Sequence, residues 1–177
     1  MPMIDPGHSL LLAIDFQARL MPAMHEAEAA LRNAGRLLEV AGMLGIARLL
    51  TEQNPKGLGP TVEQLPVGDA PVIGKQSFGA CGEDGFMDRI PADAEVVVMG
   101  WEAHVCVLQT VLGLLDAGRR VHVVQDAIGS RQPGSKEAAI RRMERHGAGI
   151  VTAEMVIFEW LRTAQHPCFR RAAALIR

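Results

Sequence analysis

Short apolar runs alternate with stretches of helical periodicity along nearly the whole chain. Residues 9–15 and 95–100 are apolar over the length of a strand, which is typical of strands buried on both faces of a sheet. Between residues 25 and 44, apolar side chains recur at the spacing of an amphipathic helix. Because strands that alternate with helices form parallel sheets, the sequence predicts an α/β fold whose parallel sheet is covered on both faces.

Turn and capping residues give the expected bounds of these elements. Strands are expected over residues 9–15, 46–52, 71–74, 95–100, 120–124 and 148–152, and helices over 25–44, 105–115, 135–146, 154–163 and 167–176. Gly45 and Gly118 are placed to end helices, and Ser135 is placed to cap one. The segments 53–69 and 125–133 are rich in Gly, Pro or polar residues and are expected to be loops.

Length and composition exclude several classes of protein. At about 150 residues per domain, the 177 residues predict one domain, residues 1–177. The 18 lysines and arginines against 20 acidic residues leave a net charge of −2, without the basic footprint of a nucleic-acid-binding protein. With 49% hydrophobic and 21% charged residues the chain is not intrinsically disordered. No apolar run approaches the ~20 residues that span a bilayer, so no membrane partner is expected.

The cysteines indicate a reducing compartment. Cys81, Cys106 and Cys168 are an odd and sparse set, whereas a disulfide framework needs an even number of cysteines in a short secreted chain. Residues 1–8 also carry no positively charged segment of a secretory signal. We therefore expect reduced thiols and a cytoplasmic protein.

Three residues of complementary chemistry lie where the chemistry of a parallel sheet is expected, at the carboxyl ends of the strands. Cys106 is expected one turn into the helix that follows residues 95–100. The free N–H groups and dipole of a helix N-terminus lower the pKa of a thiol and are able to bind a developing oxyanion. The alternative is an inert cysteine of the core.

Asp15 and Lys75 follow two other predicted strands. A carboxylate in the position of Asp15 is desolvated and suited to exchange protons with a thiol; the alternative is a helix N-cap or a structural ion pair with an arginine. An ammonium at Lys75 would hold that carboxylate ionised and stabilise negative charge on a substrate; the alternative is a solvated surface lysine. Together with Cys106 these residues form a nucleophile, an acid–base group and a cationic stabiliser, which indicates a cysteine hydrolase.

Competing chemistries lack their motifs. No glycine-rich fingerprint follows the first strand, and the chain contains neither G-x-x-x-x-G-K-[ST] nor G-x-S-x-G. His104 and Cys106 are two residues apart, but no second pair completes a zinc site. The sequence therefore predicts no cofactor and no metal.

Five short motifs carry a resemblance to a known family. They are residues 11–17 (LLAIDFQ), 51–59 (TEQNPKGLG), 74–78 (GKQSF), 100–107 (GWEAHVCV, followed by Gln109 and Thr110) and 121–131 (VHVVQDAIGSR). In this order they resemble the isochorismatase-like cysteine hydrolase superfamily, and within it the isochorismatase-domain hydrolases of unassigned substrate. The resemblance runs from about residue 9 to residue 152. It implies a three-layer α/β/α sandwich with a six-stranded parallel sheet, a Rossmann-like fold.

The resemblance also implies roles for single residues. The family's catalytic triad is carried over to Asp15, Lys75 and Cys106. A cis peptide bond is expected between Trp101 and Glu102, where it turns the Glu102 N–H toward an oxyanion hole completed by the Cys106 N–H. The implied reaction is hydrolysis of an amide-type C–N bond through a thioester on Cys106, with Asp15 as acid and base.

Departures from better-known relatives restrict the substrate. Nicotinamidases hold a metal with an Asp and two His after the second strand, but residues 51–59 contain no histidine. True isochorismatases lack the nucleophilic cysteine that is present here as Cys106. Uncharged side chains are expected to line the substrate pocket, with ordinary packing as the alternative for each of them: Phe16, Gln17, Gln53, Phe78 and Trp101.

Two rival functions stay open at this point. One is a metal-assisted, nicotinamidase-like amidase. The other is a catalytically silent member that serves as an oligomeric binding protein or scaffold. A homo-oligomer is expected on family grounds, and the apolar residues of the C-terminal segment support it, although they also suit packing within one chain (Phe158, Trp160, Leu161, Phe169 and residues 172–176).

Overall fold

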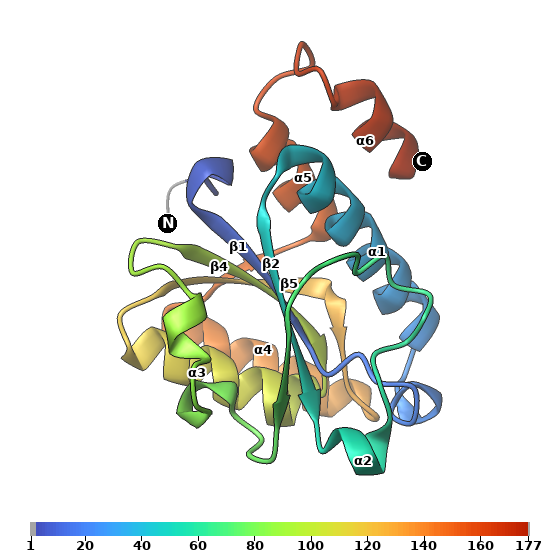
Figure 1. Ribbon diagram of the computed structural model, residues 1–177, viewed down its shortest axis with the longest axis vertical. Coiled ribbons are helices and arrows are strands. Elements are labelled where there is room, and N and C mark those ends of the chain that lie inside the picture. Colours follow the sequence, from blue (N-terminus) through green and yellow to red (C-terminus); the bar gives the residue numbers. More distant parts are fainter. Residues whose placement is uncertain (1–2, 177) are drawn as a thin grey trace.

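Six parallel strands form the central sheet of the computed structural model, which describes residues 3–176 (Figure 1). The strands lie in the order β3-β2-β1-β4-β5-β6. Their bounds are β1 Ser9–Ile14, β2 Ala47–Gln53, β3 Val72–Lys75, β4 Glu95–Trp101, β5 Arg120–Gly129 and β6 Gly149–Val151. The order reverses between β1 and β4, and in open α/β sheets a site is expected beside that reversal, at the carboxyl ends of the strands.

Helices cover both faces of this sheet. They are α1 Ala27–Leu44, α2 Pro55–Leu58, α3 Leu108–Asp116, α4 Pro133–Arg145, α5 Ala153–Leu161 and α6 Phe169–Leu175. A π-helical turn, Ala103–Val107, joins β4 to α3, and short 3₁₀ turns lie at Pro6–His8, Met21–Ala23, Ala80–Gly82 and Met87–Arg89. Helices α1 and α5 pack on one face and α3 and α4 on the other (Figure 1). The predicted three-layer α/β/α fold is therefore confirmed.

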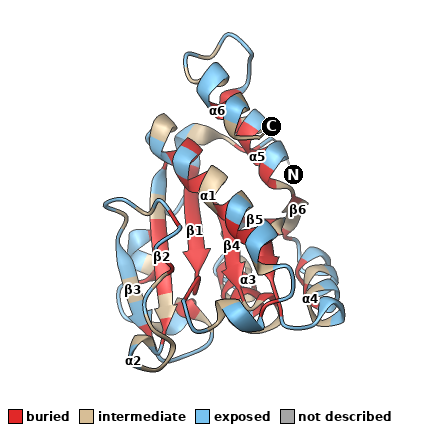
Figure 2. Cartoon of the chain, turned by 90° about the vertical axis from the view of Figure 1, so that its right-hand side faces the viewer, coloured by how far each residue is buried: buried red, intermediate tan, exposed pale blue. Residues whose placement is uncertain are grey.

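Strand β1 is buried on both faces, as its apolar sequence predicts (Figure 2). Side chains alternate between the two faces of a strand. Leu11 and Ala13 accordingly belong to the core under α1 and α5, whereas Leu12 and Ile14 belong to the core under α3 and α4. The strand that leads to Asp15 is thus fixed by packing on both sides.

Several predicted boundaries were wrong, and the predicted loop over residues 53–69 contains the short helix α2. Residues 125–129 were expected in a loop, but β5 continues to Gly129, with a shift in its register against β4 between Val98 and Gly100. This extension includes the polar residue Asp126, which is accommodated because its Oδ1 accepts a hydrogen bond of 2.8 Å from the backbone N–H of Ala153. Helix α4 begins at Pro133 and not after Ser135, since the fixed φ of proline suits the first helical position.

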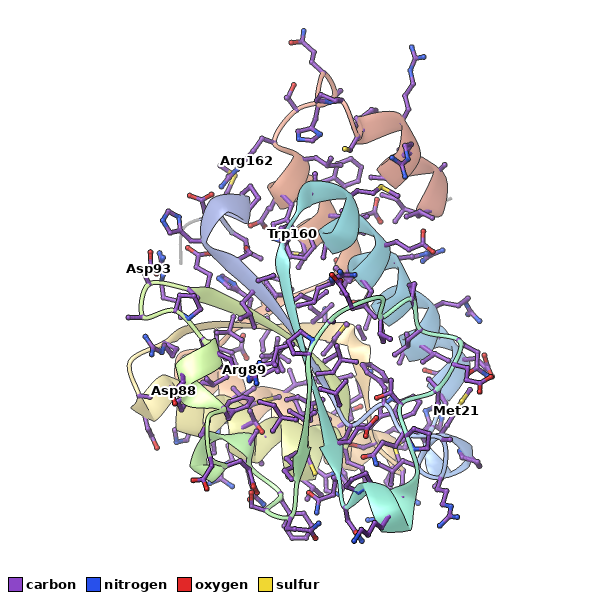
Figure 3. All side chains as sticks on the ribbon, in the orientation of Figure 1. Met21, Asp88, Arg89, Asp93, Trp160 and Arg162 are labelled. Atoms are coloured by element: carbon purple, nitrogen blue, oxygen red, sulfur yellow. The ribbon has the colours of Figure 1, made fainter. Side chains whose placement is uncertain are left out.

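The opposite end of the sheet is closed by hydrogen bonds to the N-terminal segment. Trp160 Nε1 donates to Ser9 Oγ at 2.9 Å, and Arg162 Nη2 donates to the backbone oxygen of Ile4 at 2.9 Å. Figure 3 shows Trp160 and Arg162 at the end of the sheet away from the strand arrowheads. Among residues 3–176, the structure contains no apolar helix of the length that a membrane-spanning segment requires.

Gly100 makes a close backbone contact next to the carboxyl end of β1. Its φ is +142°, and a Cβ atom built there would lie 2.2 Å from the backbone oxygen of Ile14. We expect Gly100→Ala to lower the free energy of unfolding by about 2–3 kcal/mol, because a backbone atom cannot move aside as a flexible side chain does. Urea unfolding followed by circular dichroism measures this.

Gly82 provides the matched control for this substitution. A Cβ atom at Gly82 meets nothing within 4 Å, so Gly82→Ala should leave the midpoint of unfolding nearly unchanged. Equal effects of the two substitutions would show that the contact between Gly100 and Ile14 does not restrict this position.

Candidate functional site

A buried ion pair lies at the carboxyl ends of β1 and β3. Asp15 follows β1 and Lys75 is the last residue of β3. Lys75 Nζ lies 2.8 Å from Asp15 Oδ2, and neither side chain is exposed to solvent. The backbone of Asp15 is left-handed, with φ +52°, a conformation that Asp adopts more readily than most residues. Lys75 is therefore not the surface lysine that the sequence left as an alternative.

The ammonium group of Lys75 has a complete set of oxygen partners. In addition to Asp15, Nζ donates to Gln53 Oε1 at 2.9 Å and to the backbone oxygens of Phe78 at 2.9 Å and Ser77 at 3.2 Å. An ammonium carries three N–H donors and no acceptor. The four oxygens around Nζ consequently match the protonated form of lysine.

Strand β2 lies between β1 and β3 and supplies a hydrogen bond to each member of the pair. Thr51 Oγ1 donates to Asp15 Oδ1 at 2.7 Å, and Gln53 Oε1 accepts from Lys75. Residues two apart on a strand face the same side of the sheet, so Thr51 and Gln53 reach the site together. The sequence motif contained Thr51 without indicating this contact; its spacing from Gln53 was the signal.

Cys106 lies in the π-helical turn that follows β4, and only 6% of it is exposed. Burial raises the pKa of its thiol to about 12, and the negative charge of Asp15 adds to the rise, whereas Lys75 opposes it. The charges of Asp15 and Lys75 thus act on the thiol with opposite signs. The structure thus brings the three residues together. It does not give the lowered thiol pKa that the helix N-terminus predicted, because burial has the largest effect on this pKa.

The segment before Cys106 contains the expected cis peptide bond, between Trp101 and Glu102. The Glu102 carboxylate accepts a hydrogen bond of 2.8 Å from Arg131 Nε. On the other side of Cys106, Thr110 Oγ1 donates to the Cys106 backbone oxygen at 2.7 Å and accepts from the N–H of Ala80. The turn that carries the thiol is therefore held from both sides.

Of the five predicted pocket residues, only Phe78 is well exposed, at 54%. The rings of Phe16 and Trp101 pack edge to face, with centroids 4.9 Å apart, in the core under α1 and α5. Cys106 belongs to the other core, under α3 and α4. Gln17 and Gln53 are buried, and their amides bond to the protein itself.

The loop that carries Phe78 is organised by a residue that the sequence did not single out. The Glu83 carboxylate accepts hydrogen bonds from the backbone N–H groups of Gln76 and Ser77 and from the Ser77 hydroxyl. The hydrogen bonds from Ser77 lower the pKa of the Glu83 carboxyl. Lys75 also binds two carbonyl oxygens of the same loop. Both N–H groups and carbonyl groups of the loop therefore have hydrogen-bond partners.

Metal ligands do not gather at this site. Within residues 3–176, no group of three or more His, Cys, Asp or Glu side chains is arranged to hold a metal ion. The groups assembled here are a thiol, a carboxylate and an ammonium, which suit proton transfer and nucleophilic attack.

The chain is similar to proteins of one family over most of its length. The model of the isochorismatase domain matches residues 9–155. Isochorismatase domain-containing protein 2B of Mus musculus is 34% identical over 175 residues, which cover 98% of this chain and 83% of the mouse protein.

Solved structures are also similar to this chain over nearly its whole length. The MAR1 ribonuclease of Caenorhabditis elegans has a TM-score of 0.94 and 35% identity, covering 99% of this chain and 92% of that one. The ycaC gene product of Escherichia coli, described as an octameric hydrolase of unknown specificity, has a TM-score of 0.88 and 26% identity, covering 99% and 88%. With its fold, its site and these likenesses together, the chain belongs to the isochorismatase domain family of hydrolases.

Proposed function

We propose that the protein is a cysteine hydrolase that cleaves a small amide-type C–N bond through a thioester on Cys106. The observation that carries the proposal is the buried Asp15–Lys75 ion pair acting on the Cys106 thiol. A buried ion pair is costly to desolvate. A carboxylate held this way beside a thiol is suited to take up the thiol proton when the sulfur attacks.

The reaction proceeds in two halves. Asp15 accepts the proton of Cys106 as Sγ bonds to the carbonyl carbon, and the oxyanion is stabilised by the N–H groups of Glu102 and Cys106. Asp15 then gives the proton to the leaving nitrogen as the C–N bond breaks, which leaves a thioester. Water, deprotonated by Asp15, attacks the thioester, and the thiol is restored when the acid product leaves. Lys75 keeps Asp15 ionised in the resting state and opposes negative charge throughout.

The substrate is expected to be a small molecule. Phe78 is the exposed aromatic side chain of the predicted pocket set, and the loop that carries it also binds Lys75. The other four residues of the predicted pocket set are buried at this end of the sheet, namely Phe16, Gln17, Gln53 and Trp101.

A panel of small amides tests the proposal through ammonia or amine release. We expect Cys106→Ala to lower turnover of any accepted amide about a thousandfold or more, since the nucleophile is lost. Cys81→Ala is the matched control: Cys81 is a partly buried thiol whose pKa burial raises to about 11, and its loss should leave turnover unchanged. Mass spectrometry of acid-quenched enzyme should show the acyl group on Cys106. Undiminished turnover by Cys106→Ala would contradict the mechanism.

Further measurements in the same assay distinguish the proposed cysteine hydrolase from the alternative functions. Turnover that requires added Zn²⁺ or Mn²⁺ and stops with a chelator would favour the metal-assisted amidase. The C. elegans protein is named a ribonuclease, so RNA is included as a substrate; RNA cleavage that survives Cys106→Ala would point away from cysteine chemistry. No reaction with any substrate, together with a Cys106 that no alkylating agent reaches, would favour the silent oligomeric scaffold.

Other expectations from the sequence stay predictions here. They are one domain over residues 1–177, a cytoplasmic location, a small-molecule substrate without nucleic acid, and a homo-oligomer. The last is supported by the octameric E. coli neighbour. Light scattering on a size-exclusion column measures the mass of the assembly.

A further inference from the structure

The side-chain amide of Gln53 joins the end of β2 to Lys75. Its Oε1 accepts from Lys75 Nζ at 2.9 Å, and its Nε2 donates to the backbone oxygen of Gln76 at 2.8 Å. Gln53 and Lys75 are also register partners in the sheet. One side chain therefore fixes the ammonium and the first residue of the loop after it.

Gln17 fixes Gln53 in turn. Its Oε1 accepts from the Gln53 N–H at 2.8 Å, and its Nε2 donates to the backbone oxygens of Gln53 at 3.0 Å and Gly59 at 2.6 Å. Both N–H groups of the Gln17 amide are thus used, and the residue is fully buried. Gln17 follows β1, so the chain of contacts runs from β1 through β2 to β3.

We propose that Gln53, supported by Gln17, is a positioning residue that holds the Lys75 ammonium in place and thereby controls the reactivity of Cys106, and that it does not contact the substrate. The inference rests on the proposed function for its importance to turnover. Its physical basis is independent of any substrate, because it concerns the resting hydrogen bonds of Lys75. Asp15 and Lys75 are the charged side chains that act on the Cys106 thiol, with opposite signs.

The sharpest test uses the Asp15→Asn background, in which Lys75 remains to stabilise the Cys106 thiolate. Adding Gln53→Glu there places a carboxylate against Nζ. The new charge offsets the effect of Lys75 on the thiol, so iodoacetamide labelling of Cys106 at fixed pH should slow about tenfold, the change expected from one unit of thiol pKa. The same carboxylate restores a counter-charge to the buried ammonium, so the midpoint of urea unfolding should rise relative to Asp15→Asn alone.

Two variants control this experiment. Gln53→Met removes the acceptor without adding charge and should give no such rise in stability. Glu52 lies between Thr51 and Gln53 but bonds to Thr61, so Glu52→Gln should leave the labelling of Cys106 unchanged. Circular dichroism verifies that each variant is folded.

The outcomes separate positioning from the other roles. In the Asp15→Asn background, unchanged labelling with Gln53→Glu would overturn the proposal, as would a fall in labelling without a gain in stability. With Asp15 intact, we expect Gln53→Met to lower kcat; a rise in KM alone would indicate substrate contact and also overturn it. Failure of the proposed function has a different signature, namely turnover that persists in Cys106→Ala, and it leaves the labelling result interpretable.

Discussion

Replacing Asp15 with Asn is expected to make the alkylation of Cys106 depend on pH, whereas alkylation of the unchanged protein should be nearly independent of pH. In the proposed mechanism the thiol proton of the unchanged protein moves to Asp15, so the reactive form carries as many protons as the resting form. Without that acceptor the proton leaves to solvent, and labelling should rise about tenfold per pH unit between about pH 6 and pH 9. Because the negative charge of Asp15 contributes to the raised thiol pKa, this pKa should also fall in the variant.

Lys75→Met should shift the pKa of the Cys106 thiol upward, opposite to the shift expected in Asp15→Asn. Lys75 lowers the pKa of the Cys106 thiol, so its loss raises that pKa further and slows alkylation at every pH. Turnover should fall by a factor of about 10²–10⁴ in both variants, since both disturb the acid–base step. In Lys75→Met, labelling and turnover should therefore both fall. In Asp15→Asn, turnover should fall although the pKa of the thiol falls too.

Rates of iodoacetamide labelling against pH, with mass spectrometry to locate the adduct, measure both effects. Labelling of Cys81 in the same samples serves as the internal control and should be equal in all variants. If labelling of Cys106 in the unchanged protein itself rose tenfold per pH unit, Asp15 would not be the proton acceptor.

The sequence predicted the sheet because its strongest signals are local. The apolar runs that form β1 and β4 are buried on both faces. Such strands can be recognised in a sequence as continuous apolar segments. The end of β5 was missed for the same reason. Its polar residue Asp126 interrupts the apolar pattern, and the contact that accommodates it, with the N–H of Ala153, joins distant parts of the chain.

The residues of the candidate site could be named from the sequence, but their contacts could not. Asp15, Lys75 and Cys106 follow predicted strands, and parallel strands bring their carboxyl ends to one edge, so topology alone places them near one another. The roles of Gln17 and Gln53 depend on which groups fill their hydrogen bonds. Those partners are backbone atoms of residues 53, 59 and 76 and the ammonium of Lys75, which no local pattern reveals.

The direction of the Cys106 thiol pKa was missed for an energetic reason. A helix N-terminus is visible in sequence and lowers a thiol pKa. Burial depends on the whole packed structure, and it contributes the largest effect here. The balance between the two requires coordinates.

The Asp15–Lys75 pair is also expected to dominate stability when only one partner is removed. Each of Asp15→Asn and Lys75→Met leaves an uncompensated charge where neither side chain is exposed, and we expect each to lower the free energy of unfolding by about 3–5 kcal/mol. The double variant leaves no charge uncompensated. It should therefore be more stable than the sum of the single losses predicts, by about 2–3 kcal/mol of coupling.

Urea unfolding of the four proteins, with equal slopes verified, completes this double-mutant cycle. Asn is suited to the left-handed backbone at position 15, and Met approximates the length of lysine, so neither substitution adds backbone strain. Additive losses would mean that the two charges are solvated separately, contrary to their 2.8 Å contact. A double variant that regains the coupling energy but has no turnover would show that the proposed proton transfer to and from Cys106 needs these charges beyond any contribution they make to stability.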